Sequence, residues 1–177
     1  MLNMSKISQG LITKNNKSME IKNRENAVAV WKHLDKEAVL PDALKVAMMA
    51  NIAVETAGTF DYTTEQVGRK NPAYGLFQFD PLGGLYGLYQ DYLDYIRADD
   101  SAEKQIDMLV DILMMCWPKG VSHVGRGNVL KVVRAGEIGA EKATQAFCDH
   151  ILRPGKPHIE RRLAAIKDVY DLILSEE

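Results

Sequence analysis

The sequence predicts one α+β domain that is mainly α-helical and carries a small β element. Apolar residues recur at three- and four-residue steps over most of the chain, which is typical of amphipathic helices. Residues 59–80 are different, because they combine turn formers with residue types that favour extended structure. Of the 177 residues, 46% are hydrophobic and 26% are charged, which suits a single domain with a sizeable core. Residues 1–19 are polar and poorly patterned, so we expect a flexible N-terminal arm followed by one domain over residues 20–177.

Two helices are expected before residue 60. The first begins near Ile21, since apolar residues follow at helical spacing as far as Leu34. The second opens at Pro41, because proline is suited to the first turn of a helix, and Gly58 fits its C-terminal stop. This second helix is mostly apolar and ends in a single carboxylate, Glu55.

Residues 59–80 are expected to form a small hairpin or irregular β-wing, called the wing below. Phenylalanine, tyrosine and threonine near its two ends favour extended structure. Gly68, Asn71 and Pro72 between them indicate turns. The glycines at positions 83, 84 and 87 predict that a loop follows the wing.

The rest of the chain is expected to be helical, with breaks. Ser101 is a suitable N-cap for a helix that runs to Trp117, where Pro118 is expected to stop it. The remaining expected segments, in chain order, are a loop over 119–128, helices over 129–134 and 141–152, and a last helix over 159–174.

Charge and composition exclude several function classes. A net charge of −2 argues against a dedicated nucleic-acid binder. No apolar run approaches the ~18 residues that a membrane-spanning helix needs, and the first residues lack the apolar core of a signal peptide, so we expect a protein made in a cytoplasm. Two cysteines do not make a disulfide framework, and the four histidines are scattered, so no metal site is expected. Cys148 and His150 are disfavoured as a nucleophilic pair, because near neighbours on a helix do not face each other.

Glu55 is the candidate catalytic residue. It ends a helix whose face carries Leu44, Met48 and Asn51, and a carboxylate is stabilised at the opposite end of a helix. Both its position and its apolar surroundings disfavour the ionised form. A protonated carboxylic acid is what a general acid needs when it donates to a glycosidic oxygen. The alternative interpretation is a partly exposed glutamate at a helix end with no chemical role.

The run from Tyr74 to Asp80 offers groups suited to sugar recognition. Gln78 provides a donor and an acceptor for hydroxyl or acetamide groups. Tyr74 and Phe79 are candidates to stack on a sugar ring. The alternative is that Phe77 and Phe79 fill the core beneath the wing, which we expect of at least one of them.

Together these motifs resemble the phage tail lysozyme family of the lysozyme superfamily. Three segments carry the resemblance: Asn-Ile-Ala-Val-Glu-Thr-Ala-Gly-Thr-Phe at 51–60, Tyr-Gly-Leu-Phe-Gln-Phe at 74–79, and Ala146 to Pro154 with Glu-Arg-Arg-Leu-Ala at 160–164. They are also similar to soluble lytic transglycosylases. The resemblance spans roughly residues 27–172 and implies a lysozyme-like catalytic domain. By resemblance, Glu55 is the catalytic acid facing a cleft, and the wing is the other wall.

The second carboxylate that hydrolysing relatives use is left open by the sequence. Glu65 follows Glu55 by ten residues, a spacing similar to that of phage-type lysozymes, and ranks first. Asp80 ranks second and Asp61 third. If none of the three is positioned, one acid with substrate assistance or a transglycosylase route remains. Thr56 also departs from the family pattern, since many relatives carry serine there.

The resemblance implies a muramidase of phage or prophage origin that cleaves bacterial peptidoglycan between N-acetylmuramic acid and N-acetylglucosamine. It implies a monomer that needs no cofactor and has no nucleic-acid or membrane partner. The protein would reside in the cytoplasm of the infected host before release to the periplasm and cell wall, or would be associated with the virion. The alternatives are a lytic transglycosylase of the same fold and a non-catalytic wall-binding or tail structural protein.

The segment from Arg153 to Lys167 is locally basic. Such a patch could meet anionic cell-wall polymers. We expect instead a solvated helix face in which Arg161 or Arg162 is paired with an acid.

Overall fold

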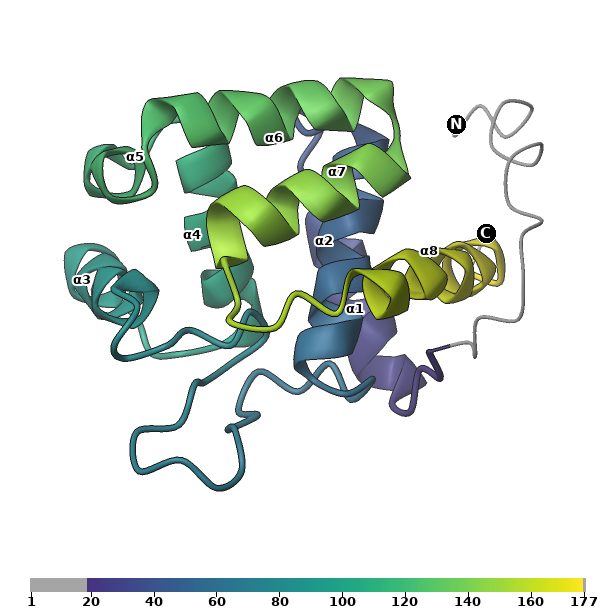
Figure 1. Ribbon diagram of the computed structural model, residues 1–177, viewed down its shortest axis with the longest axis horizontal. Coiled ribbons are helices and arrows are strands. Elements are labelled where there is room, and N and C mark those ends of the chain that lie inside the picture. The colour runs from purple at the N-terminus through teal and green to yellow at the C-terminus, as the bar shows by residue number, and fades with distance from the viewer. Residues whose placement is uncertain (1–18, 177) are drawn as a thin grey trace.

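The computed structural model describes residues 19–176, and this part of the chain is mainly helical (Figure 1). Residues 1–18, nearly all of the expected N-terminal arm, lie outside the described residues. The helices of residues 19–176 are α1 (Arg24–Asp35), α2 (Asp42–Glu55), α3 (Leu85–Ile96), α4 (Ala102–Leu113), α5 (Pro118–Val124), α6 (Arg126–Ile138), α7 (Ala140–Phe147), the π-helix η2 (Cys148–Leu152) and α8 (Ile159–Leu174).

Helix α2 forms the centre of the molecule. Every residue from Leu44 to Ala53 is buried, as expected of a helix that is apolar on all sides. It packs against α1, α6, α7 and α8 (Figure 1). Gly136 permits the close approach of α6, because a Cβ at this position would lie only 2.9 Å from the Cβ of Leu44. Glu55, the last residue of α2, follows this buried run and is half-buried, as is Val54 before it.

Several predicted helices are confirmed. The last helix has the expected bounds, Ile159–Leu174. Ser101 caps α4 as predicted, since its side chain accepts a hydrogen bond from the backbone N–H of Lys104. The predicted helix over 141–152 corresponds to α7 and η2, with a change from α- to π-helical geometry at Cys148.

Three predicted breaks are wrong, because glycine and proline each have more than one role in helices. The helix expected to run to Trp117 ends at Leu113, and Pro118 occupies the first turn of α5, a position that proline also favours. Residues 119–128 therefore hold most of α5 and the start of α6 instead of a loop. Gly136 lies inside α6 rather than between two helices. The segment after Gly84 is already helical, since α3 begins at Leu85.

The wing contains no β-strand within the described chain. Its pairing is limited to two isolated bridges, Glu65 with Tyr74 and Tyr74 with Phe79. The predicted small β element is therefore not confirmed, and the wing projects from the helical body as an irregular loop (Figure 1). Left-handed backbone at Gly75 and Gln78 interrupts any extended run through the segment.

Side chains rather than a sheet hold the wing in place. The buried Gln105 of α4 accepts a hydrogen bond from the backbone N–H of Leu76 at 2.7 Å and donates to the carbonyl of Tyr62 at 3.0 Å. A Cβ at position 75 would lie 2.4 Å from the Gln105 Oε1, so glycine is required there. Aromatic contacts add to this attachment, since the Phe77 ring lies 6.0 Å from that of Phe147 in α7. The wing is thus a loop with a fixed position relative to α2.

Candidate active site

A groove of about 1060 Å³ lies between the C-terminal end of α2, the wing and the segment that joins η2 to α8. Its lining residues are Val54, Glu55, Gln66, Arg69, Ala73, Phe77, Gln78, Asp80, Gly83, Leu85, Leu152, Arg153, Pro154, Gly155, Lys156, His158, Arg161 and Arg162. A smaller cavity of about 280 Å³ lies apart from it, between α1, α4 and residues 60–62. The large groove holds Glu55 and is the candidate active site.

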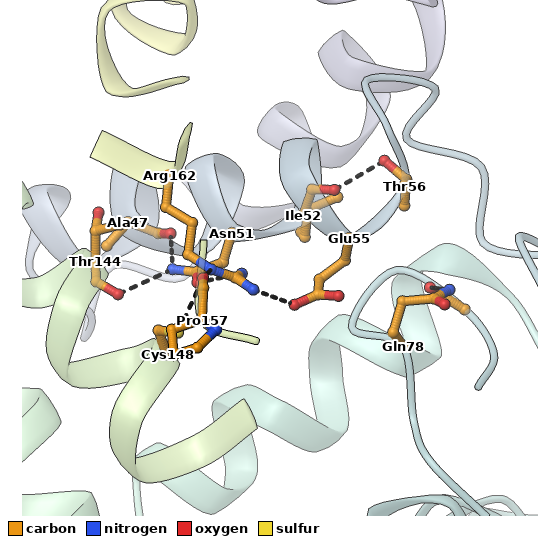
Figure 2. Close-up of polar contacts among 11 residues, drawn as sticks. Ala47, Asn51, Ile52, Glu55, Thr56, Gln78, Thr144, Cys148, Pro157 and Arg162 are labelled. Carbon is orange, nitrogen blue, oxygen red and sulfur yellow. Dashed lines mark hydrogen bonds and ion pairs between the residues drawn. The ribbon is translucent and has the colours of Figure 1, made fainter. Parts of the chain in front are cut away.

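Glu55 is held in the groove by an ion pair. Its Oε1 accepts a hydrogen bond from Arg162 Nη2 at 2.7 Å (Figure 2). The Glu55 side chain is 14% exposed, whereas that of Arg162 is 1% exposed. Within residues 19–176, the other carboxylate oxygen of Glu55 has no hydrogen-bond partner. One oxygen is therefore held by Arg162, and the other is available to a ligand in the groove.

Arg162 is itself hydrogen-bonded to three residues, of which Glu55 and Asn51 lie in α2 and Pro157 lies in the segment before α8. Its Nη1 donates to Asn51 Oδ1 at 2.8 Å, and its Nε donates to the carbonyl of Pro157 at 2.6 Å (Figure 2). Asn51 lies one helical turn before Glu55 and donates in turn to the carbonyls of Ala47 and Thr144. A buried charge needs this degree of pairing and hydrogen bonding to be tolerated. The network joins α2, α7, the segment before α8 and α8 itself at one guanidinium group.

Sequence reasoning anticipated only part of this network. The expected pairing of Arg161 or Arg162 with an acid is confirmed for Arg162, but the acid is the candidate catalytic residue itself. The helical pattern places Asn51 on the Glu55 face but does not indicate its hydrogen bond to Arg162. A polar residue one turn before the glutamate on an otherwise apolar helix is the signal that could have identified it.

Cys148 lies under this network and has no free surface. It is buried, and its Sγ faces the carbonyl of Pro157 at 3.8 Å. Burial raises the pKa of the Cys148 thiol, although the nearby Arg162 acts in the opposite direction. A thiol of this kind is a poor nucleophile.

Gln78 and Asp80 contribute the facing wall of the groove. In the view of Figure 2, the Glu55 carboxylate lies between the Arg162 guanidinium and the Gln78 amide. The Gln78 amide nitrogen donates to the carbonyls of Thr64 and Gly75, both at 3.0 Å. The side-chain N–H donors of Gln78 are therefore used within the wing. The side-chain carbonyl oxygen of Gln78 is the group that remains to accept a hydrogen bond from a ligand.

Asp80 is an ionised acid in the same groove. Its Oδ1 accepts from the backbone N–H of Leu82 at 2.9 Å, and its Oδ2 accepts from Arg69 Nη1 at 3.0 Å. The backbone hydrogen bond from Leu82, followed by that from Arg69, lowers the pKa of Asp80. This carboxylate therefore carries a negative charge at neutral pH.

The other two candidate acids do not line this groove. Glu65 is exposed, and its backbone pairs with that of Tyr74. Asp61 lines the smaller cavity, and its carboxylate accepts hydrogen bonds from the backbone and hydroxyl of Thr63. The placement favours Asp80 over Glu65, which reverses the order suggested by chain spacing.

Two of the proposed sugar-binding aromatics are also absent from the residues that line the groove. Phe79 is fully buried and stacks on Tyr89 with ring centroids 5.1 Å apart, so it belongs to the core and its predicted sugar contact is corrected. The hydroxyl of Tyr74 donates to Asp100, and burial together with this hydrogen bond raises the pKa of Tyr74. Phe77 borders the groove, but its side chain is only 2% exposed and its ring packs against Phe147. The two-residue alternation of a β-strand could not predict which of these aromatics borders the groove, because residues 74–80 do not form a strand.

Two further properties concern the described residues as a whole. Over residues 19–176, no three or more histidine, cysteine, aspartate or glutamate side chains are grouped so that they could hold a metal ion. The same region contains no helix with the length and apolar character needed to cross a membrane.

The mainly helical architecture, with a glutamate at the end of its central helix and open to a groove, is consistent with a lysozyme-like domain. The chain belongs to the phage tail lysozyme family, whose sequence model matches residues 25–173. No curated protein and no solved structure matches the chain. Membership of this family indicates a lysozyme-like function with peptidoglycan as the substrate.

Proposed function

We propose that the protein is a muramidase that cleaves the bond between N-acetylmuramic acid and N-acetylglucosamine, with Glu55 as the general acid. The observation that carries this proposal is the placement of Glu55. The carboxyl group lies in the groove with one oxygen held by Arg162 and the other without a partner among residues 19–176. This arrangement would present a single proton-donating oxygen to a bound glycan.

In this proposal Arg162 acts after the proton transfer. Its guanidinium group lies 2.7 Å from the Glu55 carboxylate and would stabilise the negative charge that is left when the proton has moved to the glycosidic oxygen. The same hydrogen bond would hold the carboxyl group in one orientation in the groove.

Asp80 is the proposed second carboxylate. Its lowered pKa keeps it ionised, and it lines the same groove as Glu55. In a hydrolase it would activate water or support the oxocarbenium-like transition state. Gln78 would accept a hydrogen bond from a sugar hydroxyl or acetamide on the same wall.

A lytic transglycosylase is the second candidate, and one observation favours it. Both oxygens of Asp80 are already engaged, by Leu82 and by Arg69, which limits the part that this carboxylate can take in a second step. In that case the substrate itself would supply the attacking oxygen, and the product would carry an anhydro end. We also propose a phage or prophage protein that acts as a monomer on the cell wall, either after release from the host cytoplasm or as part of a virion.

The test is digestion of purified peptidoglycan by the wild-type protein and by Glu55→Gln, with the new chain ends identified by mass spectrometry. Glu55→Gln is expected to lower the rate by ~10²–10⁴-fold, which is the usual contribution of one general acid. It keeps a hydrogen-bond acceptor for Arg162 but removes its negative partner, so circular dichroism is measured beside the digestion to establish that the variant is folded. Glu65→Gln, an exposed acid outside the groove, is the matched control and should retain activity. Full activity of a folded Glu55→Gln protein would remove the basis of the proposal, and reducing or anhydro ends distinguish the two routes.

A further inference from the structure

Three exposed cations form one side of the groove and are called the cationic wall: Arg153, Lys156 and Arg161. Among the residues that the structure describes, none of the three lies within ion-pair distance of an acidic group. The other two basic residues of the groove are paired, Arg162 with Glu55 and Arg69 with Asp80.

The groove therefore has a local excess of positive charge. Five Lys or Arg side chains and two acidic side chains line it. The chain as a whole has the opposite balance, with a net charge of −2. Unpaired cations that face a groove raise the local concentration of anionic ligands and supply charge-assisted hydrogen bonds once these bind.

The cationic wall is fixed relative to Glu55. The π-helix η2 ends at Leu152, and its C-cap residue Arg153 has a left-handed backbone (φ +48°) and donates its N–H to the carbonyl of Cys148 at 2.8 Å. Further along, the carbonyl of Pro157 accepts from the same Arg162 that holds Glu55. The two ends of the segment that carries Arg153 and Lys156 are thus anchored, so the backbone that bears these charges has a defined place beside the candidate acid.

We propose that the cationic wall is a subsite for the carboxylates of the peptide stems that peptidoglycan carries on its muramic acid residues. The inference rests on the proposed function and adds a substrate preference to it. Polymers of N-acetylglucosamine are uncharged and contain no anionic partner for these cations. A stem peptide places several carboxylates next to the sugar backbone. Arginine is suited to this partner, since its planar guanidinium group binds a carboxylate through two parallel hydrogen bonds. On this proposal the protein discriminates peptide-bearing peptidoglycan from uncharged polymers of N-acetylglucosamine.

The test measures binding of a soluble N-acetylmuramyl peptide that has free carboxylates and contains no glycosidic bond. The variant combines Arg153→Gln, Lys156→Gln and Arg161→Gln. The matched control combines Lys131→Gln, Arg134→Gln and Lys142→Gln, which removes the same charge from exposed positions of α6 and α7 outside the groove. Calorimetry should show about tenfold weaker binding for the groove variant and no change for the control, because each exposed ion pair contributes little alone.

A second probe, the same muramyl peptide with its carboxylates amidated, separates charge from shape. Wild-type protein should bind it about as weakly as the groove variant binds the acidic probe. Equal affinity of wild type for both probes, or an unchanged affinity of the groove variant, overturns the inference. Tighter binding of a glycerol phosphate oligomer than of the muramyl peptide would also overturn it, since the subsite would then serve phosphate polymers.

These outcomes are independent of catalysis. Charge-dependent binding by a protein that releases no new chain ends from peptidoglycan would contradict the proposed muramidase and support the subsite. Cleavage of peptidoglycan by a protein that binds both probes equally would support the proposed muramidase and contradict the subsite.

Discussion

The ion pair between Glu55 and Arg162 places opposite demands on the two residues. Arg162 is buried and must be paired, whereas Glu55 must keep one oxygen free at the groove. The geometry meets both demands because the guanidinium group has donors for Asn51 and Pro157 as well as for the carboxylate. We interpret Arg162 as a positioning residue whose side chain orients the acid.

Replacement of Arg162 by alanine should therefore destabilise the fold. It leaves the Asn51 amide oxygen and the Glu55 carboxylate without their buried cation, and loss of one partner of a buried pair costs about 3 kcal/mol or more. Urea unfolding followed by circular dichroism measures the difference. Arg161→Ala on the exposed neighbouring position is the control and should change stability by no more than about 0.5 kcal/mol. Equal stability of the two variants would show that the network adds nothing to the fold.

Asp80 should make a pH-dependent contribution to stability. Its folded-state pKa is lowered below the ordinary value of 3.8 by Leu82 and Arg69, so the folded protein favours the ionised side chain. That stabilisation is fully present above pH 3.8 and is lost as the pH falls from there through the lower folded-state pKa. The free energies of unfolding of wild type and Asp80→Asn should differ at pH 6 and converge at about pH 2. A difference that persists unchanged in acid would contradict this assignment.

Local patterns predicted the site residues that depend only on neighbouring sequence. The position of Glu55 follows from an apolar helical stripe with a stop at Gly58. The partner of Glu55 could not be identified from local sequence, because Arg162 lies 107 residues away. The two side chains meet only because α8 packs on α2. The order of Glu65 and Asp80 was also beyond local reasoning, since an irregular loop has no periodicity from which to infer which side chains face inward.

At the level of elements, the position of the wing depends on hydrogen bonds from one buried glutamine. These bonds take the place of the backbone hydrogen bonds between strands that would hold a β-hairpin. Gln105 bonds to the backbone of Leu76 and Tyr62 and to the carboxylate of Asp100. No sequence pattern indicated this, because a glutamine in a helix is normally read as solvent-facing. The β-forming residues of the segment instead bury their rings or their hydroxyl groups, as Phe79 and Tyr74 do.

Gln105→Leu should loosen the wing. The change leaves the Leu76 N–H without its acceptor in a buried place, which costs about 1–3 kcal/mol. Hydrogen exchange should rise in residues 62–78 while the protection of α2 is retained. Gln145→Leu, at an exposed position of α7, is the matched control and should leave exchange in the wing unchanged. Unaltered exchange in the Gln105→Leu wing would contradict the anchoring role.

Across the whole molecule, the prediction of a mainly helical domain is confirmed, and the predicted β component is not. Hydrophobic periodicity is a strong signal in long segments, and α8 was located to the residue. Proline and glycine were weaker guides, because Pro118 begins a helix and Gly136 lets two helices approach. Each residue is compatible with both a break and a continued helix, and only the packing around it decides between them.

The separation of Glu55 and Arg162 along the chain has a consequence for how activity arises during folding. Their contact closes a loop of more than a hundred residues, and long-range contacts of this kind form late because chain entropy opposes them. We expect a refolding chain to recover its helical circular dichroism before it recovers wall cleavage in samples taken at successive times. Simultaneous recovery of both signals would contradict this order. A chain that lacks α8 would hold Glu55 without Arg162, so the proposed active site is complete only after α8 has packed on α2.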